Sequence, residues 1–212
     1  GRSCNTCQPH CHVVPDARFV SRHCRFFITA GLDAKNLSPT TQALKKMADD
    51  LIVLDRDGVI NVDSPHYIKS AAEWQPLPGS IEAIGMLCQA GFKVYVATNQ
   101  AGLARQKFSA ADLAAMHAKL EGLVAAAGGR IEGIFFCPHH PDDQCGCRKP
   151  QPGLLQQIRA FHPTEIRSMV FVGDSVKDIE AARRAGCDSA PVLTGNGRQA
   201  RELLGTQAQK SP

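Results

Sequence analysis

The chain has 212 residues, 43% of them hydrophobic, and a formal net charge of +4. This length allows one domain with a sizeable core. Seven of the 24 basic residues but only two of the 20 acidic ones lie in residues 1–46, so the remainder carries 17 basic and 18 acidic side chains. That balance argues against nucleic acid as a partner. No apolar stretch approaches the ~20 residues of a membrane span, and residues 1–30 lack the apolar core of a secretory signal.

Residues 1–46 differ in composition from the rest of the chain. The run Cys4–His12 resembles a zinc knuckle, but no hydrophobic periodicity follows it, and Met47 stands four residues before the first predicted strand. We therefore expect a disordered or non-native leader over 1–46, with a small zinc module as the alternative. We expect the folded domain over 47–205 and a frayed tail over 206–212.

Strands and helices alternate along the predicted domain. Leu51–Leu54 is an apolar, β-branched run that predicts a strand buried on both faces. A helix with Ser80 as N-cap and Gly91 as its stop follows. The pattern then predicts a strand over 92–97, a helix over 109–127, a strand over 131–136, a helix over 153–161, a strand over 169–172, a helix over 176–185 and a strand over 190–193. This alternation predicts an α/β fold, a three-layer sandwich around a parallel sheet.

Polar side chains follow three of the predicted strands directly. Asp55 and Asp57 follow the first strand, Thr98 and Asn99 the second, and Asp174 the fourth. Ligands of open parallel sheets bind beyond the carboxyl ends of the strands, so these side chains should converge. Asp55 and Asp174 would repel each other unless a hard cation lay between them, and Mg²⁺ suits such a site.

Phosphoryl transfer is the chemistry that these residues fit best. Asp55 would attack phosphorus and form an aspartyl-phosphate, while Asp57 would act as acid and then as base. Thr98 and Asn99 would donate to the phosphoryl oxygens, and Lys149 would add positive charge. Each residue alone also fits a surface turn, a helix cap or a solvated side chain, so the hypothesis depends on their combination.

A second cluster lies between residues 137 and 147. Cys137, His139, Cys145 and Cys147 supply three thiolates and one imidazole, which suits a closed structural Zn²⁺ site; His140 is the competing imidazole. Such a site would order the loop just before Arg148 and Lys149. The mixture of cysteine with histidine favours metal binding in a reducing compartment over a disulfide framework, so we expect a cytoplasmic protein.

These motifs resemble a known family. Asp55-x-Asp57-Gly58, Thr98-Asn99, Lys149 and Gly173-Asp174 resemble the four motifs of the haloacid dehalogenase superfamily. More closely, the segments DRDGVIN, TNQAGLAR, CPHHP…CxCRKPQPG and VGDS are similar to those of the zinc-containing D-glycero-D-manno-heptose 1,7-bisphosphate 7-phosphatases. The resemblance covers about residues 47–198 and excludes 1–46.

The resemblance implies a Rossmann-like fold with a minimal cap, catalytic Mg²⁺ and structural Zn²⁺. It implies removal of the C7 phosphate of the heptose bisphosphate on the route to ADP-heptose and the lipopolysaccharide core. Mg²⁺ would be held by Asp55, the Asp57 carbonyl and Asp174. Thr98, Asn99, Arg148 and Lys149 would bind phosphate, and further substrate contacts would come from Asp63, Ser64, Pro65, His66, Gln100 and Ala101. We expect a monomer whose partner is a small phosphorylated sugar.

Two alternatives stay open. Histidinol-phosphate phosphatases share the motifs and the zinc loop, so they are the nearest enzymatic rival. A non-catalytic zinc-bearing binding module on the same fold is the other. One difference from some relatives is that Ser175, rather than a lysine, follows Asp174.

Overall fold

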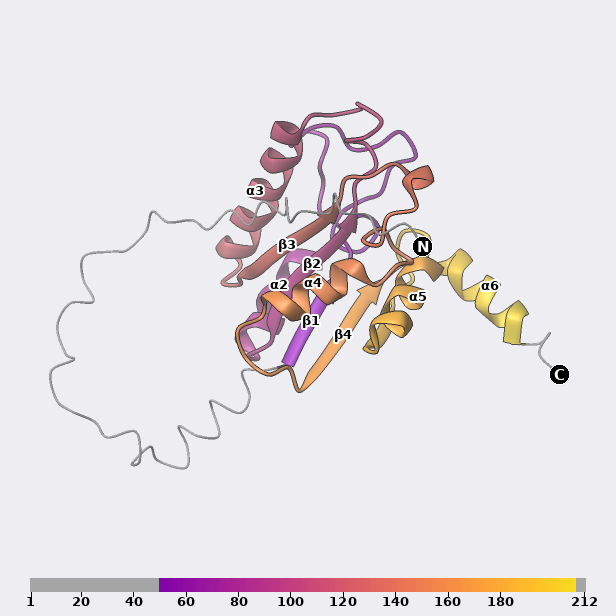
Figure 1. The fold of residues 1–212 in the computed structure, drawn as a ribbon. Coiled ribbons are helices and arrows are strands. Elements are labelled where there is room, and N and C mark those ends of the chain that lie inside the picture. The colour runs from indigo at the N-terminus through magenta and orange to yellow at the C-terminus, as the bar shows by residue number, and fades with distance from the viewer. Residues whose placement is uncertain (1–49, 209–212) are drawn as a thin grey trace, which may run out of the picture.

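A computed structural model describes residues 50–208 of the chain (Figure 1). The predictions for the leader over 1–46 and for residues 209–212 lie outside the described residues. Among the residues that the structure does describe, no helix is both long and apolar enough to cross a membrane.

Five parallel strands form one sheet in the order β3-β2-β1-β4-β5. They are β1 (Asp50–Leu54), β2 (Lys93–Asn99), β3 (Ile131–Cys137), β4 (Ser168–Gly173) and β5 (Asp188–Pro191). The central strand is β1, where Val53 pairs with Tyr95 of β2 on one side and with Phe171 of β4 on the other. The predicted parallel sheet is confirmed.

Helices cover both faces of this sheet. α2 (Ser80–Gln89) and α3 (Ala110–Ala126) pack on one face, and α4 (Gly153–Phe161) and α5 (Val176–Ala185) pack on the other. A short 3-10 helix, η1 (Pro141–Asp143), lies in the loop after β3. The last helix, α6 (Gly197–Ala208), ends away from the body of the molecule (Figure 1).

The side chains of β1 alternate between two hydrophobic cores. Leu51 and Val53 pack with α4 and α5, while Ile52 and Leu54 face α2 and α3. Both faces of the strand are therefore buried, as its unbroken apolar sequence predicted. Burial of each large apolar side chain contributes about 1.5–3 kcal/mol to the stability of the fold. The central strand is therefore firmly packed, and it places Asp55 and Asp57, which follow it.

The order of the strands fixes where a site can form. The chain adds β2 and β3 on one side of β1 and then returns to place β4 on the other side. Loops that leave β1 and β4 therefore diverge and open a crevice at the carboxyl ends of these two strands. Asp55 and Asp174 follow β1 and β4 directly, so both lie at this switch point.

Within residues 50–208, little else covers the crevice. Residues 55–79 and 100–109 form turns and isolated bridges between the sheet and the helices α2 and α3. For the part of the chain that the structure describes, the prediction of a minimal cap is confirmed.

Three details differ from the sequence prediction. Gly79, at a φ of 81°, is the N-cap of α2, because the Ser80 hydroxyl donates instead to the carbonyls of Ile60 and Leu77. β5 begins two residues earlier than predicted, since it is a largely exposed edge strand in which hydrophobicity gives no guide. α6 was not predicted, and it continues through residues 206–208, which the sequence assigned to the tail.

Candidate active site

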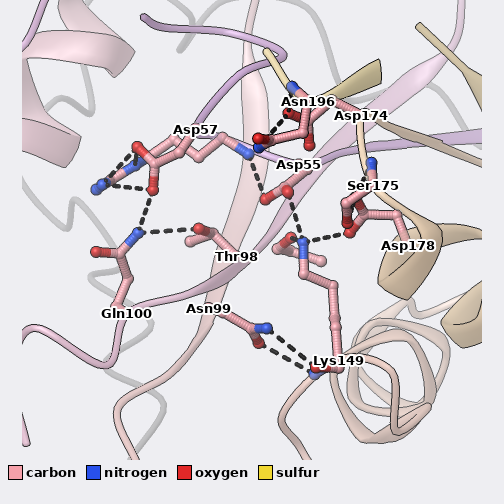
Figure 2. Close-up of polar contacts among 12 residues, drawn as sticks. Asp55, Asp57, Thr98, Asn99, Gln100, Lys149, Asp174, Ser175, Asp178 and Asn196 are labelled. Carbon is pink, nitrogen blue, oxygen red and sulfur yellow. Dashed lines mark hydrogen bonds and ion pairs between the residues drawn. The ribbon is translucent and has the colours of Figure 1, made fainter. Parts of the chain in front are cut away.

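Asp55 lies at the floor of the crevice. Its backbone N–H donates to the carbonyl of Val172 at 2.9 Å, which joins the ends of β1 and β4. Its Oδ1 accepts from the backbone N–H of Arg56 at 2.7 Å, and its Oδ2 lies 2.8 Å from Nζ of Lys149 (Figure 2). Burial raises the pKa of Asp55 to about 7, although the charge of Lys149 acts in the opposite direction.

Lys149 is the cation at the centre of the site. Its side chain is 3% exposed, and Nζ lies between Asp55 and Asp178, 2.7 Å from Oδ1 of the latter. Nζ also donates to the carbonyl of Ala97 in β2 at 3.1 Å. Burial alone lowers the pKa of Lys149, but the two carboxylates outweigh it and raise the pKa, so the side chain stays charged.

Asn99 fixes the backbone of Lys149. Its Nδ2 donates to the Lys149 carbonyl at 3.2 Å, and its Oδ1 accepts from the Lys149 N–H at 3.0 Å (Figure 2). The sequence predicted Asn99 as a donor to phosphate. In the structure its amide joins the end of β2 to the segment that carries Lys149.

Asp57 is clamped by five contacts from three side chains. Nε and Nη2 of Arg56 donate to its two oxygens at 2.9–3.1 Å. Nδ2 of Asn61 donates to Oδ1, and Nε2 of Gln100, which also donates to Thr98 Oγ1, donates to Oδ2. Burial alone raises the pKa of Asp57, but the Arg56 charge and these hydrogen bonds lower it overall. One side of the carboxylate remains open, since 23% of the side chain is exposed.

Asp174 supplies the second carboxylate at the switch point. Its Oδ2 accepts from the backbone N–H and from Nδ2 of Asn196, at 2.7 and 3.2 Å. A Cβ on Gly58 would lie 2.2 Å from this oxygen and one on Gly195 would lie 2.1 Å from it. Both glycines have positive φ angles, so their positions require glycine on two grounds.

A divalent cation fits between these carboxylates. Oxygens of Asp55, Asp174 and Asp178 all lie within 4.8 Å of one another. Burial raises the pKa of Asp174 as well, so a cation there would stabilise charges that are costly on their own. The sequence named Asp55, the Asp57 carbonyl and Asp174 as magnesium ligands, and this geometry fits the two carboxylates of that set.

The sequence prediction missed Asp178. Its Oδ2 accepts from the backbone and hydroxyl of Ser175 at 3.0 and 2.6 Å, in a capping box at the start of α5. Its other oxygen pairs with Lys149. The available signal was the spacing of four residues from Asp174, which brings both carboxylates to one end of a helix. Ser175 is therefore occupied in capping α5.

A cavity of about 390 Å³ opens above this floor. Ten of the predicted site residues line it: Asp55, Asp57, Asp63, Ser64, Thr98, Asn99, Gln100, Arg148, Lys149 and Asp174. Of the predicted residues, Pro65, His66 and Ala101 lie outside this lining, and Pro65 and His66 are exposed. Lining residues that the sequence prediction missed are Arg56, Tyr67, Ile68, Phe108, Ser175, Lys177, Asp178 and Asn196.

The predicted zinc ligands converge beside this cavity. Nδ1 of His139 lies 3.5 Å from Sγ of Cys137 and 3.2 Å from Sγ of Cys147, and Cys145 Sγ lies 3.5 Å from both other sulfurs. A tetrahedral zinc site with Zn–S bonds of 2.3 Å separates its ligands by about 3.8 Å, so the cluster fits Zn²⁺. The competing His140 instead caps η1.

Known proteins are similar to this chain in sequence and in fold. A family model described as HAD-hydrolase-like matches residues 146–210. The D-glycero-beta-D-manno-heptose-1,7-bisphosphate 7-phosphatase of Pseudomonas aeruginosa is 54% identical over 151 residues, which cover 71% of this chain and 85% of that protein. The chain belongs to this phosphatase family.

Other members of the heptose bisphosphate phosphatase family agree with this assignment. The enzyme of the same name from Pseudomonas putida is 50% identical and is covered over 87% of its length, against 72% of this chain. A crystal structure of D,D-heptose 1,7-bisphosphate phosphatase from Bordetella bronchiseptica, complexed with magnesium and phosphate, has a TM-score of 0.70 at 48% identity. The match covers 73% of this chain and 86% of that one.

Proposed function

We propose that the chain is a Mg²⁺-dependent phosphatase that removes the C7 phosphate of D-glycero-D-manno-heptose 1,7-bisphosphate. The observation that carries the proposal is the buried row Asp55–Lys149–Asp178, with Asp174 within 4.8 Å, at the floor of a cavity. A carboxylate held this close to a buried cation is oriented for attack, and the family's named substrate supports the choice of ester.

Magnesium would be held by Asp55, Asp174 and the backbone carbonyl of Asp57. The complex of the Bordetella bronchiseptica enzyme with magnesium and phosphate supports this assignment. When bound, the cation neutralises part of the negative charge that a phosphate and two carboxylates bring together.

Asp55 acts as the nucleophile in the first step. A carboxylate oxygen attacks phosphorus, the bond from phosphorus to the sugar oxygen breaks, and that oxygen takes a proton from Asp57. Lys149 offsets the charge on the phosphoryl group, and the Thr98 hydroxyl lies in the same cavity. In the second step Asp57 accepts a proton from water, which attacks the aspartyl-phosphate, releases phosphate and restores Asp55.

Arg148 fits a role in holding the substrate. It lines the cavity, and its Nη1 is buried with no hydrogen-bond partner among residues 50–208. A buried guanidinium nitrogen without an acceptor is costly, and a phosphate oxygen of the substrate would satisfy it. Asp63 and Ser64 line the same cavity and would contact the sugar hydroxyls.

The remaining assignments follow from the same function. Zn²⁺ on the Cys137, His139, Cys145 and Cys147 cluster would order the loop that leads directly to Arg148 and Lys149. A cytoplasmic monomer that supplies the route to ADP-heptose and the lipopolysaccharide core fits a small-molecule substrate of this kind.

Substrate preference tests the proposal against its nearest rival. The purified chain would be offered heptose 1,7-bisphosphate, as both anomers, and histidinol phosphate, each with and without Mg²⁺. We expect phosphate release that requires Mg²⁺ and a higher kcat/KM for one of the heptose anomers. A higher kcat/KM for histidinol phosphate would contradict the proposed substrate. The absence of phosphate release from every ester, in wild type and in Asp55→Asn alike, would favour a binding module.

A further inference from the structure

Arg56 stands between the two catalytic aspartates and is itself almost fully buried, with 1% of its surface exposed. Its side chain turns onto Asp57 as a fork, in which Nε and Nη2 reach Oδ1 at 3.1 and 2.9 Å and Nη2 reaches Oδ2 at 3.0 Å. A planar guanidinium in this arrangement fixes the rotation of a carboxylate as well as its place.

The backbone of Arg56 holds the same region together. Its N–H donates to Oδ1 of Asp55, and its carbonyl accepts from the N–H groups of Ile60 and Asn61 at 2.8 and 3.1 Å. One residue therefore contacts the nucleophile, the acid and the turn that carries them. Because Asn61 in turn donates to Asp57, the turn and the fork hold the acid from two directions.

His117 of α3 lies behind the guanidinium. Its Nε2 is 3.5 Å from Nη1 of Arg56, on the nitrogen that the Asp57 fork does not use, and its ring lies 5.9 Å from that of Phe136. Burial, and then the charge of Arg56, lower the pKa of His117 to about 3. The ring is therefore neutral at neutral pH, so Nε2 can accept from Arg56 without charge repulsion.

We propose that Arg56, braced by His117, is a positioning residue that holds Asp57 in place for proton transfer to the leaving oxygen. The inference rests on the proposed function, since it takes Asp57 as the proton donor. After the transfer Asp57 is a carboxylate, which is the form that the fork of Arg56 binds best. The open side of Asp57 faces the cavity, where the leaving oxygen would lie.

The test compares two classes of phosphate ester in Arg56→Met, which keeps the length of the buried stem but removes the fork. An alkyl sugar phosphate needs a proton on its leaving oxygen, whereas 4-nitrophenol leaves readily as the anion. A positioned acid contributes typically about 10²–10⁴-fold, so we expect kcat/KM to fall about 100-fold or more for heptose bisphosphate. For 4-nitrophenyl phosphate we expect a fall of less than about tenfold, since that ester depends little on the acid.

Two further variants separate positioning from general support of the fold. Arg56→Lys offers one compact charge instead of a fork and should lie between wild type and Arg56→Met in the ratio of the two kcat/KM values. His117→Phe keeps the ring against Phe136 but removes the acceptor, and should shift the ratio in the same direction by less. If Arg56→Met does not fold, these two variants carry the test.

Arg167→Met is the matched control. Arg167 pairs with Asp50 at the opposite end of β1, so its loss should lower stability and leave the ratio of kcat/KM for the two esters at the wild-type value.

An equal fall of kcat/KM for both esters in all the Arg56 and His117 variants would overturn the positioning role. A different outcome is that the wild-type chain hydrolyses 4-nitrophenyl phosphate and an alkyl phosphate other than heptose bisphosphate, but not heptose bisphosphate itself. That result would overturn the proposed substrate alone. The comparison would then use that alkyl ester.

Discussion

At the scale of single residues, the site is built around one buried lysine that pairs with two carboxylates. Lys149 lies 2.8 Å from Asp55 and 2.7 Å from Asp178, and all three residues are buried. Buried charges of opposite sign stabilise one another by their attraction. Removal of one of them leaves the others buried without a partner, which lowers the stability of the folded state.

Lys149→Met should therefore lower both stability and activity. Removing one partner of a buried ion pair costs about 3–5 kcal/mol, so we expect the free energy of unfolding in urea to fall by that order. Phosphate release should fall by about 10²-fold or more, since a preorganised charge at the reacting group is lost. Lys93→Met is the control, because Lys93 is a partly exposed residue that pairs with Glu132 at 3.7 Å. An Lys149→Met protein as stable and active as Lys93→Met would contradict the assignment.

The lowered pKa of His117 predicts that the stability of the fold depends on pH. Its pKa is lowered from 6.5 to about 3 by burial and then by Arg56, so between these values the unfolded chain binds a proton that the folded chain does not. Stability therefore falls as the pH falls through this window, by about 2 kcal/mol from this group between pH 7 and pH 5. Urea unfolding of wild type and His117→Phe should show this loss in the wild type only; parallel pH profiles would contradict it.

Single residues also show what the sequence could and could not predict. Asp55, Asp57 and Asp174 follow strands and Thr98 lies at the end of β2, so the sheet brings them together whatever the details of packing. Pairing partners such as Asp178 and Asn196 depend on which side chain turns toward which neighbour. Around Asp174, for example, the packing requires the close approach of Gly58 and Gly195, which a sequence pattern does not contain.

At the scale of elements, the loop between β3 and α4 determines where the side chain of Lys149 lies. β3 ends at Cys137, the other three members of the cluster follow by Cys147, and Lys149 comes two residues later. The backbone N–H of Gly153, at the start of α4, donates to the carbonyl of Gly146 at 3.1 Å. A Cβ on Gly153 would lie 2.4 Å from that carbonyl oxygen, so the loop and the helix are packed closely.

Cys145→Ala should release zinc and loosen this loop. Zinc content, measured by plasma mass spectrometry, should fall from one per chain to well below one, because a structural site needs all four ligands. Activity should fall by up to about 100-fold through displacement of Arg148 and Lys149.

The control for the zinc experiment is Cys187→Ala. Cys187 is a free, half-buried cysteine outside the cluster, so its loss should leave the zinc content unchanged. One zinc per chain in Cys145→Ala would show that the ligand set is wrong.

Prediction from sequence was good for central elements and poor for peripheral ones. β1 has apolar residues toward both cores, and α3 begins with a capping box at Ser109, so their sequences carry strong local signals. β5 and α6 lie at one edge of the fold, where three of the four residues of β5 are exposed. There the structure depends on pairing with β4 and on the turn around Asn196, which are not local features.

At the scale of the whole molecule, the order of the strands explains why the site lies at the carboxyl ends of β1 and β4. β1 and β4 are neighbours in the sheet but are separated by more than 110 residues in the chain, and the crevice forms where the strand order reverses. Every residue assigned to the site lies within the described part of the chain, residues 50–208.

A chain without residues 1–46 should keep full activity and the same requirement for Mg²⁺, because all the proposed catalytic and metal-binding residues remain. Phosphate release by the shortened and full-length chains, compared at equal concentration, checks this. A shortened chain that folds but is inactive would assign a function to residues 1–46.

The proposed function requires Asp55 to remove the phosphate at C7. Phosphorus NMR of heptose 1,7-bisphosphate, followed during incubation with the wild-type chain and Mg²⁺, tests it most directly. We expect loss of the C7 signal, an unchanged C1 signal and growth of inorganic phosphate, with loss of the C7 signal and growth of phosphate both absent in Asp55→Asn. Loss of the C1 signal instead, or hydrolysis by Asp55→Asn at the wild-type rate, would contradict it.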